Sequence, residues 1–326
     1  MSFDLKKSFS AIKTALTDKT ERKITLSPTV LVLSTYVLLL LSKIIDLTFL
    51  KRENEYFAVV ILQLMIFLLP GAVWCKFSGE RYLSGLRLKP PKLRTVPLIL
   101  SASFVMASGG LLIAILFGGL DSLSGNFSLY DTFISKDDGT VPSKLYLLLA
   151  YAALPALCEE FVYRGILCRE YERGGVTRAI VLSSLFFALL HFNLANLPIY
   201  LFAGCVLAMT LYATRSLFGA VIAHFLYNIF GLFGQPYMST LYSITGSRTL
   251  FIMIVGLIFL ISAAVFCGEA SRLYKKYLVR GESARYRTPV IKDPQGIKSS
   301  YIDVIKNPSA IACFAVYIIA LLISFL

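Results

Sequence analysis

Nine apolar segments, almost free of charged residues, recur along the 326-residue chain and restrict its fold more than any other feature. With its flanks, each approaches the roughly 20 residues that an α-helix needs to cross a bilayer. Backbone N–H and C=O groups cannot stay unpaired in hydrocarbon, so helices are the expected spanning structure. We therefore predict an all-α, polytopic transmembrane bundle of about eight or nine spans. The segments are Leu26–Ser42, Tyr56–Trp74, Val96–Phe117, Leu145–Cys158, Ala179–Phe192, Leu197–Leu211, Leu217–Phe233, Leu250–Cys267 and Ala310–Leu326.

Composition agrees with a membrane location. Hydrophobic residues make up 57% of the chain and charged residues only 16%. A soluble protein of this length needs more polar surface, so the apolar side chains are expected to face lipid. The sequence shows no internal repeat and no second domain. We predict a cytoplasmic amino-terminal segment, 1–25, followed by a single transmembrane domain, 26–326.

The basic residues are unevenly distributed, and their positions predict the topology. The net charge is +13, with six Lys or Arg in residues 1–24, five in Ser78–Arg94 and nine in Gly268–Pro308. Gly118–Ser143 has four Asp and one Lys. With a cytoplasmic amino terminus, nine spans place every basic cluster inside and the acidic loop outside, the usual asymmetry of membrane proteins. We expect a multi-pass protein of a prokaryotic cell membrane, with loop 268–308 on anionic lipid and no nucleic-acid partner.

Three ionisable residues, Glu159, Glu160 and Arg164, continue the fourth apolar segment. Charges at membrane depth are costly and are usually functional. Glu160 and Arg164 are four residues apart and can pair on one helix face, so a structural ion pair is one interpretation. Glu159 lies about 100° further round the helix. It could therefore face a cavity, where a carboxylate can act as a general base or acid.

The chain has only two histidines, His191 and His224, and both fall in apolar segments. A lone histidine in such a segment is usually a hydrogen-bonded packing residue. Here each has a partner four residues away on the expected helix face, because Phe187 precedes His191 and Asn228 follows His224. All the imidazole of the protein thus lies at membrane depth, which favours a functional role.

Counting residues from the expected turns brings these side chains to one level. Gly174-Gly175 is expected to turn the chain between the fourth and fifth segments, with Glu159 about 15 residues before it and His191 about 16 after it. At a rise of about 1.5 Å per residue, two antiparallel helices place them at nearly the same depth. The seventh segment begins after Arg215, at the membrane surface where Gly174-Gly175 also turns. His224 therefore lies about nine residues, or roughly 14 Å, from that surface. Three helices are therefore expected to bring a carboxylate, two imidazoles and a carboxamide into one layer.

These residues together resemble the three-motif signature of the CPBP family, which groups CAAX prenyl proteases and bacteriocin-processing enzymes and is also called Abi. The resemblance covers about 145–234, roughly a quarter of the chain. It implies a membrane protease of about eight helices that cleaves membrane-associated peptides or proteins near the membrane surface. The motifs match in residue type, order and spacing, and they are Glu159-Glu160-x-x-x-Arg164, Phe187-x-x-x-His191 and His224-x-x-x-Asn228.

The resemblance also implies a role for each residue. Glu159 corresponds to the glutamate that activates the water, and His191 helps to orient or deprotonate that water. His224 and Asn228 correspond to the pair that stabilises the tetrahedral oxyanion. Amide hydrolysis needs an activated water and donors aimed at the developing O⁻, and a dry site strengthens both interactions. This mechanism uses no cofactor. The supporting positions are Glu160, Arg164 and Phe187.

Zinc hydrolysis with the same residues is an alternative. Glu159, His191 and His224 could bind Zn²⁺ and leave a fourth position open for water. The sequence contains no HExxH motif. If Glu159 were a ligand, Glu160 would have to be the base while paired with Arg164. We therefore favour a mechanism without a metal.

Two other classes of function are compatible with buried glutamate and histidine. Proton-coupled transporters use such residues, although they often show paired broken helices and internal repeats, and the sequence shows neither. A non-catalytic scaffold or immunity protein is the other. For a protease, prenylated carboxyl-terminal peptides, secreted leader peptides and toxin peptides are all compatible substrates.

Overall fold

The computed structural model describes residues 27–44, 55–79, 82–118, 143–279 and 301–324. Within these ranges every regular element is a helix. Six helices are long and apolar enough to cross a membrane, and three shorter apolar helices accompany them. Each of the nine predicted apolar segments falls on one of these helices. The predicted fold class, a helical membrane bundle, is confirmed.

Several of the spans contain short π-helical stretches, labelled η, inside a continuous helix. One such helix runs from α8 to α10 through η4 and η5. The α-helices are α2 (Thr29–Ile44), α3 (Glu55–Gln63), α4 (Leu69–Phe77), α5 (Val96–Gly118), α8 (Lys144–Leu147), α9 (Leu154–Glu160), α10 (Cys168–Tyr171), α11 (Val176–Leu189), α12 (Leu197–Thr214), α13 (Leu217–Ile229), α14 (Gln235–Thr245), α15 (Arg248–Val279) and α17 (Pro308–Ser324). The π-helical stretches are η1 (Leu64–Leu68), η4 (Leu148–Ala153), η5 (Phe161–Leu167) and η7 (Phe230–Gly234).

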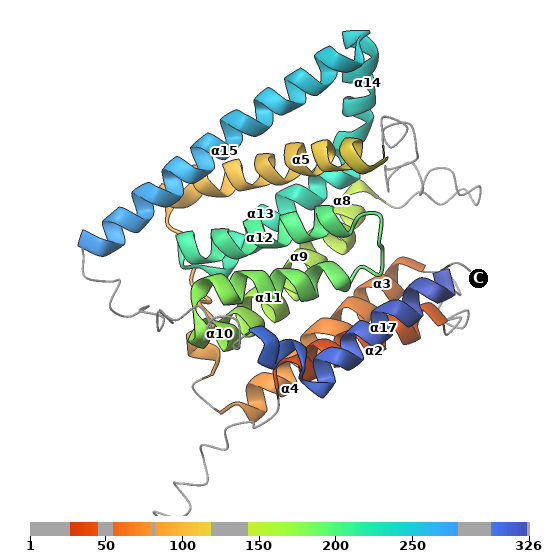
Figure 1. Cartoon of the computed structure of the whole chain (residues 1–326), viewed down its shortest axis with the longest axis vertical. Helices are drawn as coiled ribbons and strands as arrows, with labels where there is room; N and C mark the ends of the chain where they lie inside the picture. Colours follow the sequence, from red (N-terminus) through yellow and green to blue (C-terminus); the bar gives the residue numbers. More distant parts are fainter. Residues whose placement is uncertain (1–26, 45–54, 80–81, 119–142, 280–300, 325–326) are drawn as a thin grey trace, which may run out of the picture.

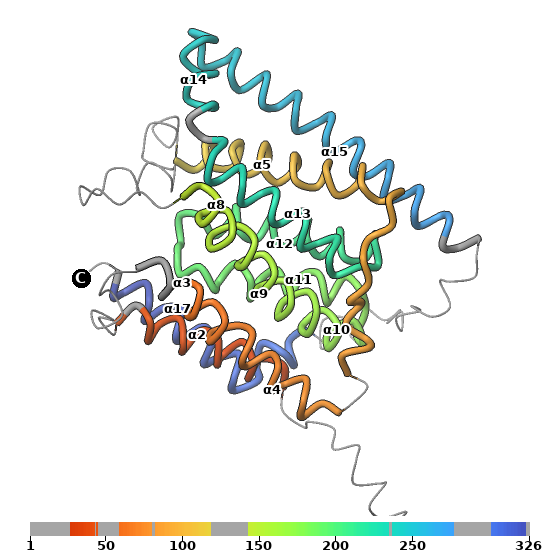
Figure 2. Tube along the Cα trace, turned by 180° about the vertical axis from the view of Figure 1, so that it is seen from behind, coloured from red at the N-terminus to blue at the C-terminus, as the bar shows by residue number. Residues whose placement is uncertain are grey.

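The helices form three groups (Figures 1 and 2). α5 and α15 lie side by side along one edge of the bundle, and α2 and α17 lie side by side along the opposite edge with α3 and α4. Helices α9 to α13 occupy the middle. One cluster of buried apolar side chains joins the middle helices to α2, α4 and α17, and a second joins α12 and α13 to α5 and α15. The middle helices are thus covered by protein on both sides, as polar residues at membrane depth require.

Two turns of the middle group lie where the sequence predicted them. Gly174-Gly175 separates α10 from α11, and Gly175 has a φ of 114°, a backbone conformation that favours glycine. α12 ends at Thr214, and the next residue, Arg215, adopts a left-handed φ of 56°. Ser216 then caps α13, because its Oγ accepts a hydrogen bond from a backbone N–H of the first turn. These two turns bring α10, α11, α12 and α13 to one end of the bundle (Figure 1).

The segment before α5 crosses the same end of the bundle. Arg87 forms an ion pair with Glu172 at 2.8 Å, which ties this segment to the end of the helix that carries the predicted site glutamates. Arg272 on α15 donates a hydrogen bond of 3.0 Å to the backbone carbonyl of Arg94. The end of the basic segment at Arg94 and the basic end of α15 therefore lie together, as the predicted topology requires.

The segment predicted as a loop, 268–308, is helical at both of its described ends. α15 continues to Val279, because this stretch holds good helix formers and no proline, and Glu269 pairs with Arg272 one turn later. The chain is helical again over 301–305. Outside the described residues lie the middle of this segment (280–300), the predicted cytoplasmic segment 1–25 and most of the acidic loop 118–143.

We expect the two ends of the bundle to be accessible from opposite sides of the membrane. In a background without the native cysteines, an impermeant maleimide should label Lys92→Cys and Lys275→Cys only from the cytoplasm. It should label Lys144→Cys only from outside. All three lysines are exposed on the protein surface, so burial inside the protein does not prevent their replacements from reacting. Labelling of Lys275→Cys and Lys144→Cys from the same side would contradict this topology.

Candidate active site

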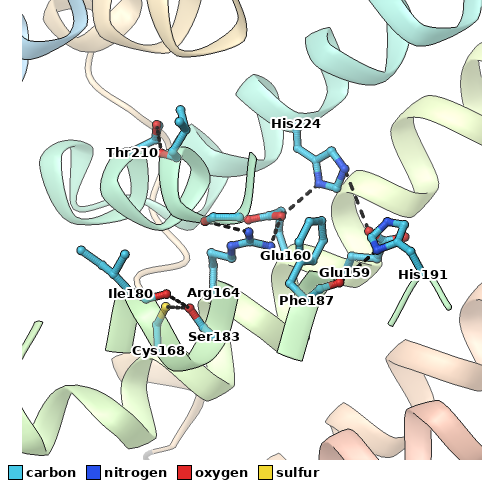
Figure 3. Close-up of polar contacts among 12 residues, drawn as sticks. Glu159, Glu160, Arg164, Cys168, Ile180, Ser183, Phe187, His191, Thr210 and His224 are labelled. Carbon is cyan, nitrogen blue, oxygen red and sulfur yellow. Dashed lines mark hydrogen bonds and ion pairs between the residues drawn. The ribbon is translucent and has the colours of Figure 1, made fainter. Parts of the chain in front are cut away.

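The long helix from α8 to α10 carries the two carboxylates in its middle part, α9, between η4 and η5. Pro155 lies in the first turn of α9 and has no N–H for the α-helical ladder, which is consistent with the change to π-helical pitch in η4. Such π-helical stretches inside α-helices are frequent at functional sites. Figure 3 shows Glu159 and Glu160 beside His224 of α13 and Phe187 of α11.

Arg164 and Glu160 form the ion pair that their spacing predicted. Arg164 Nη1 lies 2.8 Å from Glu160 Oε1, and both side chains are fully buried. Arg164 Nη2 also donates a hydrogen bond of 3.0 Å to the backbone carbonyl of Gly204 on α12. The same oxygen of Glu160 accepts a hydrogen bond from Nδ1 of His224 at 3.0 Å. Glu160 thus connects the buried arginine to a histidine on another helix, a contact that the motif spacing did not predict.

Glu159 lies on the other side of His224 from this ion pair. Its Oε2 is 4.0 Å from Nε2 of His224, and its side chain keeps 11% of its exposure, whereas the side chain of Glu160 keeps none. A separation of 4.0 Å is too long for a direct hydrogen bond, and one polar atom can contact both groups. Glu159 is therefore the carboxylate that a water or a substrate can reach, and Glu160 is held behind it.

His191 lies at the site, but not on the helix face that its spacing predicted. α11 ends at Leu189, and His191 occupies the turn that follows, before Phe192 with its left-handed φ of 47°. The last carbonyls of a helix have no intrahelical partner. His191 satisfies one of them, because its Nδ1 donates to the carbonyl of Phe187 at 3.0 Å. Its ring stacks on Tyr200 of α12, with centroids 3.7 Å apart and planes at 13°.

The ring of Phe187 lies among the two histidines and the buried arginine (Figure 3). Its centroid is 5.1 Å from that of His191 and 5.8 Å from that of His224, and both contacts are edge-to-face. Arg164 Cζ lies 4.2 Å from the same centroid, within cation–π distance. Phe187 therefore fixes the spacing of the two imidazoles and covers the guanidinium group with an aromatic face.

Asn228 lies one turn after His224 on α13, as its spacing predicted, and its side chain is partly buried. Its Nδ2 donates a hydrogen bond of 3.3 Å to the carbonyl of Ala152 in η4. A carboxamide has two N–H donors. This hydrogen bond uses only one of them.

These hydrogen bonds determine where the two imidazoles carry their protons. A carbonyl oxygen can only accept, so His191 is protonated on Nδ1 and, when neutral, has a lone pair on Nε2. Glu160, paired with Arg164, likewise accepts from Nδ1 of His224. His191 can thus accept a proton or orient a water through Nε2. His224 donates from Nε2 only when its ring carries both protons.

The zinc alternative requires Glu159, His191 and His224 to converge on one point. The free Nε2 of each histidine is chemically suitable, since the other nitrogen of each ring already contacts an oxygen. Across the described ranges, however, no three His, Cys, Asp or Glu side chains are placed to hold a metal ion. The donor types fit zinc, but their placement does not.

Two contacts to the site come from α12, which contributes no motif residue. Tyr200 stacks on His191, and the carbonyl of Gly204 accepts from Arg164. The two residues are four apart, so they lie on one face of the helix. That spacing was visible in the sequence, but nothing in it separates a contact to the site from ordinary helix packing.

Residues 141–230 match the Rce1-like family, described as type II CAAX prenyl endopeptidase Rce1-like. The matched segment contains all three motifs and confirms the resemblance to the CAAX protease family. No curated protein and no solved structure gives a significant match to the chain. The family match supports an intramembrane endopeptidase of the CAAX type in general. The apolar helices support an integral membrane location.

Proposed function

We propose that this chain, of which residues 141–230 match the Rce1-like family, is an intramembrane endopeptidase that hydrolyses peptide bonds with a water activated by Glu159. The observation that carries the proposal is the position of this reachable carboxylate, 4.0 Å from Nε2 of His224. The buried pair of Glu160 and Arg164 lies behind that histidine and holds its Nδ1. A base and hydrogen-bond donors arranged round one point are what amide hydrolysis needs.

In the first step Glu159 accepts a proton from the water. The water oxygen forms a bond to the peptide carbonyl carbon, and the π electrons of the carbonyl move to its oxygen. His191 accepts a hydrogen bond from the same water at Nε2 and thereby orients it. The product is a tetrahedral intermediate that carries an oxyanion. Because bulk water is excluded from a site at membrane depth, these interactions are not screened.

In the second step His224 and Asn228 donate hydrogen bonds to the oxyanion. His224 does so from Nε2 as the doubly protonated ring, while Glu160 accepts from Nδ1. Asn228 uses the N–H that does not contact Ala152. The carbon–nitrogen bond then breaks, its electron pair stays on nitrogen, and the proton on Glu159 passes to the leaving amine. One water is consumed, and a carboxylic acid and an amine are released.

We propose that the reaction needs no metal ion, and replacing the oxyanion donors tests this. We expect His224→Ala and Asn228→Ala each to lose about 10²–10³ in rate and to keep measurable cleavage, as removal of one oxyanion donor usually does. A zinc ligand behaves differently, because its loss empties the site. We therefore also expect strong chelators to leave the wild type active and elemental analysis to find no stoichiometric zinc. One zinc per chain, lost with all activity in His224→Ala, would overturn the metal-free mechanism.

The family description makes a prenylated peptide with a CAAX carboxyl terminus the first probe of activity. We propose a matched pair of fluorogenic peptides, with and without the prenyl group, incubated with the purified chain in lipid nanodiscs. The wild type should cleave at least the prenylated peptide, and Glu159→Gln should cleave neither. The ratio of the two wild-type rates measures how much the prenyl group contributes. Absence of cleavage together with a proton flux that depends on Glu159 would favour a transporter.

A further inference from the structure

α12 contacts both halves of the candidate site from one face. Tyr200 stacks on His191, and four residues later the carbonyl of Gly204 accepts a hydrogen bond from Arg164. His191 is the histidine beside the proposed water, and Arg164 belongs to the ion pair that holds the other histidine. A shift of α12 would therefore change the positions of both His191 and Arg164.

Tyr200 restricts the orientation of His191. The imidazole lies in the turn beyond the end of α11, where no helical backbone holds it. Phe187 fixes one ring nitrogen through its carbonyl and contacts the ring edge-on at 5.1 Å. These two contacts do not fix the tilt of the imidazole ring about this hydrogen bond. The parallel face of Tyr200, at 3.7 Å, fixes the tilt and so the direction of Nε2.

Gly204 permits the close approach of α12 to α11. A Cβ at this position would lie 2.9 Å from Ser184 Cβ and 3.0 Å from Ser184 Cα. The Cα is a backbone atom, so the two helices would have to move apart. That movement would draw the carbonyl of Gly204 away from Arg164 Nη2, now at 3.0 Å. Arg164 pairs with Glu160, and Glu160 holds Nδ1 of His224.

We propose that α12 is the positioning element of the site. Tyr200 sets the plane of His191, and the close approach at Gly204 sets the ion pair that holds His224. The proposal rests on the endopeptidase function proposed above. Tyr200 and Gly204 are positioning residues, since each acts through a site residue and not on the peptide bond.

Substitutions of Tyr200 separate ring stacking from general packing. Tyr200→Leu removes the aromatic face, and we expect kcat on the prenylated peptide to fall about 10- to 100-fold, because small misplacements of catalytic groups cost this much. KM should change little. Tyr200→Phe keeps the stacked face and should restore kcat to within about twofold of the wild type.

A chemical readout of His191 is independent of any substrate. Diethyl pyrocarbonate acylates unprotonated imidazole nitrogen, and the chain has only two histidines, so mass spectrometry follows each one separately. We expect His191 to react several-fold faster in Tyr200→Leu than in the wild type or in Tyr200→Phe. His224, on another helix, should show no such change between the three proteins.

The second contact is tested with a matched pair of glycines. Gly204→Ala should lower kcat about 10²-fold, with helical content retained by circular dichroism. Gly256→Ala is the control, because a Cβ there meets no atom within 4 Å, and it should match the wild type. If Gly204→Ala does not accumulate, Gly204→Ala with Ser184→Gly replaces it, since the second change removes the nearest side-chain atoms.

Several outcomes would overturn the proposal. Wild-type kcat and an unchanged His191 acylation rate in Tyr200→Leu would show that Tyr200 does not position His191. Wild-type kcat in folded Gly204→Ala would show that the close approach at Gly204 does not position the ion pair. If the wild type itself cleaves no peptide, the proposed function fails, and the acylation rates still decide whether Tyr200 holds His191. If Glu159→Gln is inactive and both α12 variants match the wild type, the positioning role alone is wrong.

Discussion

Glu159→Gln is expected to abolish peptide cleavage while the protein keeps its fold. Glutamine has nearly the same shape as glutamate but cannot accept the proton of the water. A positioned acid–base group contributes about 10²–10⁴ in rate, and we expect a loss near the upper end because Glu159 both takes the proton and returns it. The measurement is kcat of the purified variant on the prenylated peptide, with the yield and the thermal midpoint as checks of folding.

A matched surface variant completes this experiment. Glu269→Gln changes the same functional group on α15, where Glu269 pairs with the exposed Arg272. It should leave kcat unchanged. Glu159→Gln with wild-type cleavage would show that Glu159 is not the base. The proposed mechanism would then be wrong.

Arg164→Ala is expected to lower the stability of the folded protein by about 3–5 kcal/mol, because it leaves Glu160 as a buried carboxylate without its partner. Both side chains of this pair are fully buried. The change also removes the side-chain donor to the carbonyl of Gly204 and the cation over the Phe187 ring. The measurement is the yield of folded protein and its thermal midpoint in detergent.

Arg272→Ala is the matched control on the surface. Arg272 also pairs with a glutamate on its own helix, but its side chain is 55% exposed. Such a pair contributes about 0–1 kcal/mol, so the midpoint should stay close to that of the wild type. An equal effect of Arg164→Ala and Arg272→Ala would mean that the buried pair does not stabilise the bundle. Recovery of Arg164→Ala by a second change, Glu160→Gln, would show that the unpaired charge causes the loss.

The helices and the ion pair could be predicted because each depends on local spacing. Apolar length predicts a span, and four residues between Glu160 and Arg164 place their side chains on one helix face. The turn at Gly174-Gly175 was predictable for the same reason, since glycine adopts the φ of 114° that Gly175 has. Counting residues from the expected turns also predicted that Glu159 and the two histidines share one layer.

What could not be predicted depends on contacts between helices or on helix ends. The hydrogen bond from His224 to Glu160 joins α13 to α9, and no periodicity in the sequence encodes it. His191 was expected on the face of a helix, but α11 ends two residues earlier and the imidazole satisfies the free carbonyl of Phe187 instead. The contact through Gly204 uses a backbone carbonyl, which every residue has. Residue types therefore gave no signal for it.

The prediction of a loop over 268–308 was wrong at its two described ends for a related reason. Basic residues after Gly268 suggested a surface loop, but charged residues are also good helix formers, and α15 continues to Val279. Charge predicts the side of the membrane on which this segment lies. It did not identify where the helix ends.

The most direct test of proteolysis by this chain compares whole membranes and does not require that its substrate be identified first. Membranes from cells that carry the wild type or Glu159→Gln would be compared by mass spectrometry of protein amino and carboxyl termini. We expect a small set of termini from membrane-associated proteins or peptides to be present with the wild type and absent with Glu159→Gln. The corresponding uncleaved proteins should accumulate in the variant. Identical sets of termini in the two strains, with equal amounts of folded protein, would contradict the assignment of this chain as an intramembrane endopeptidase.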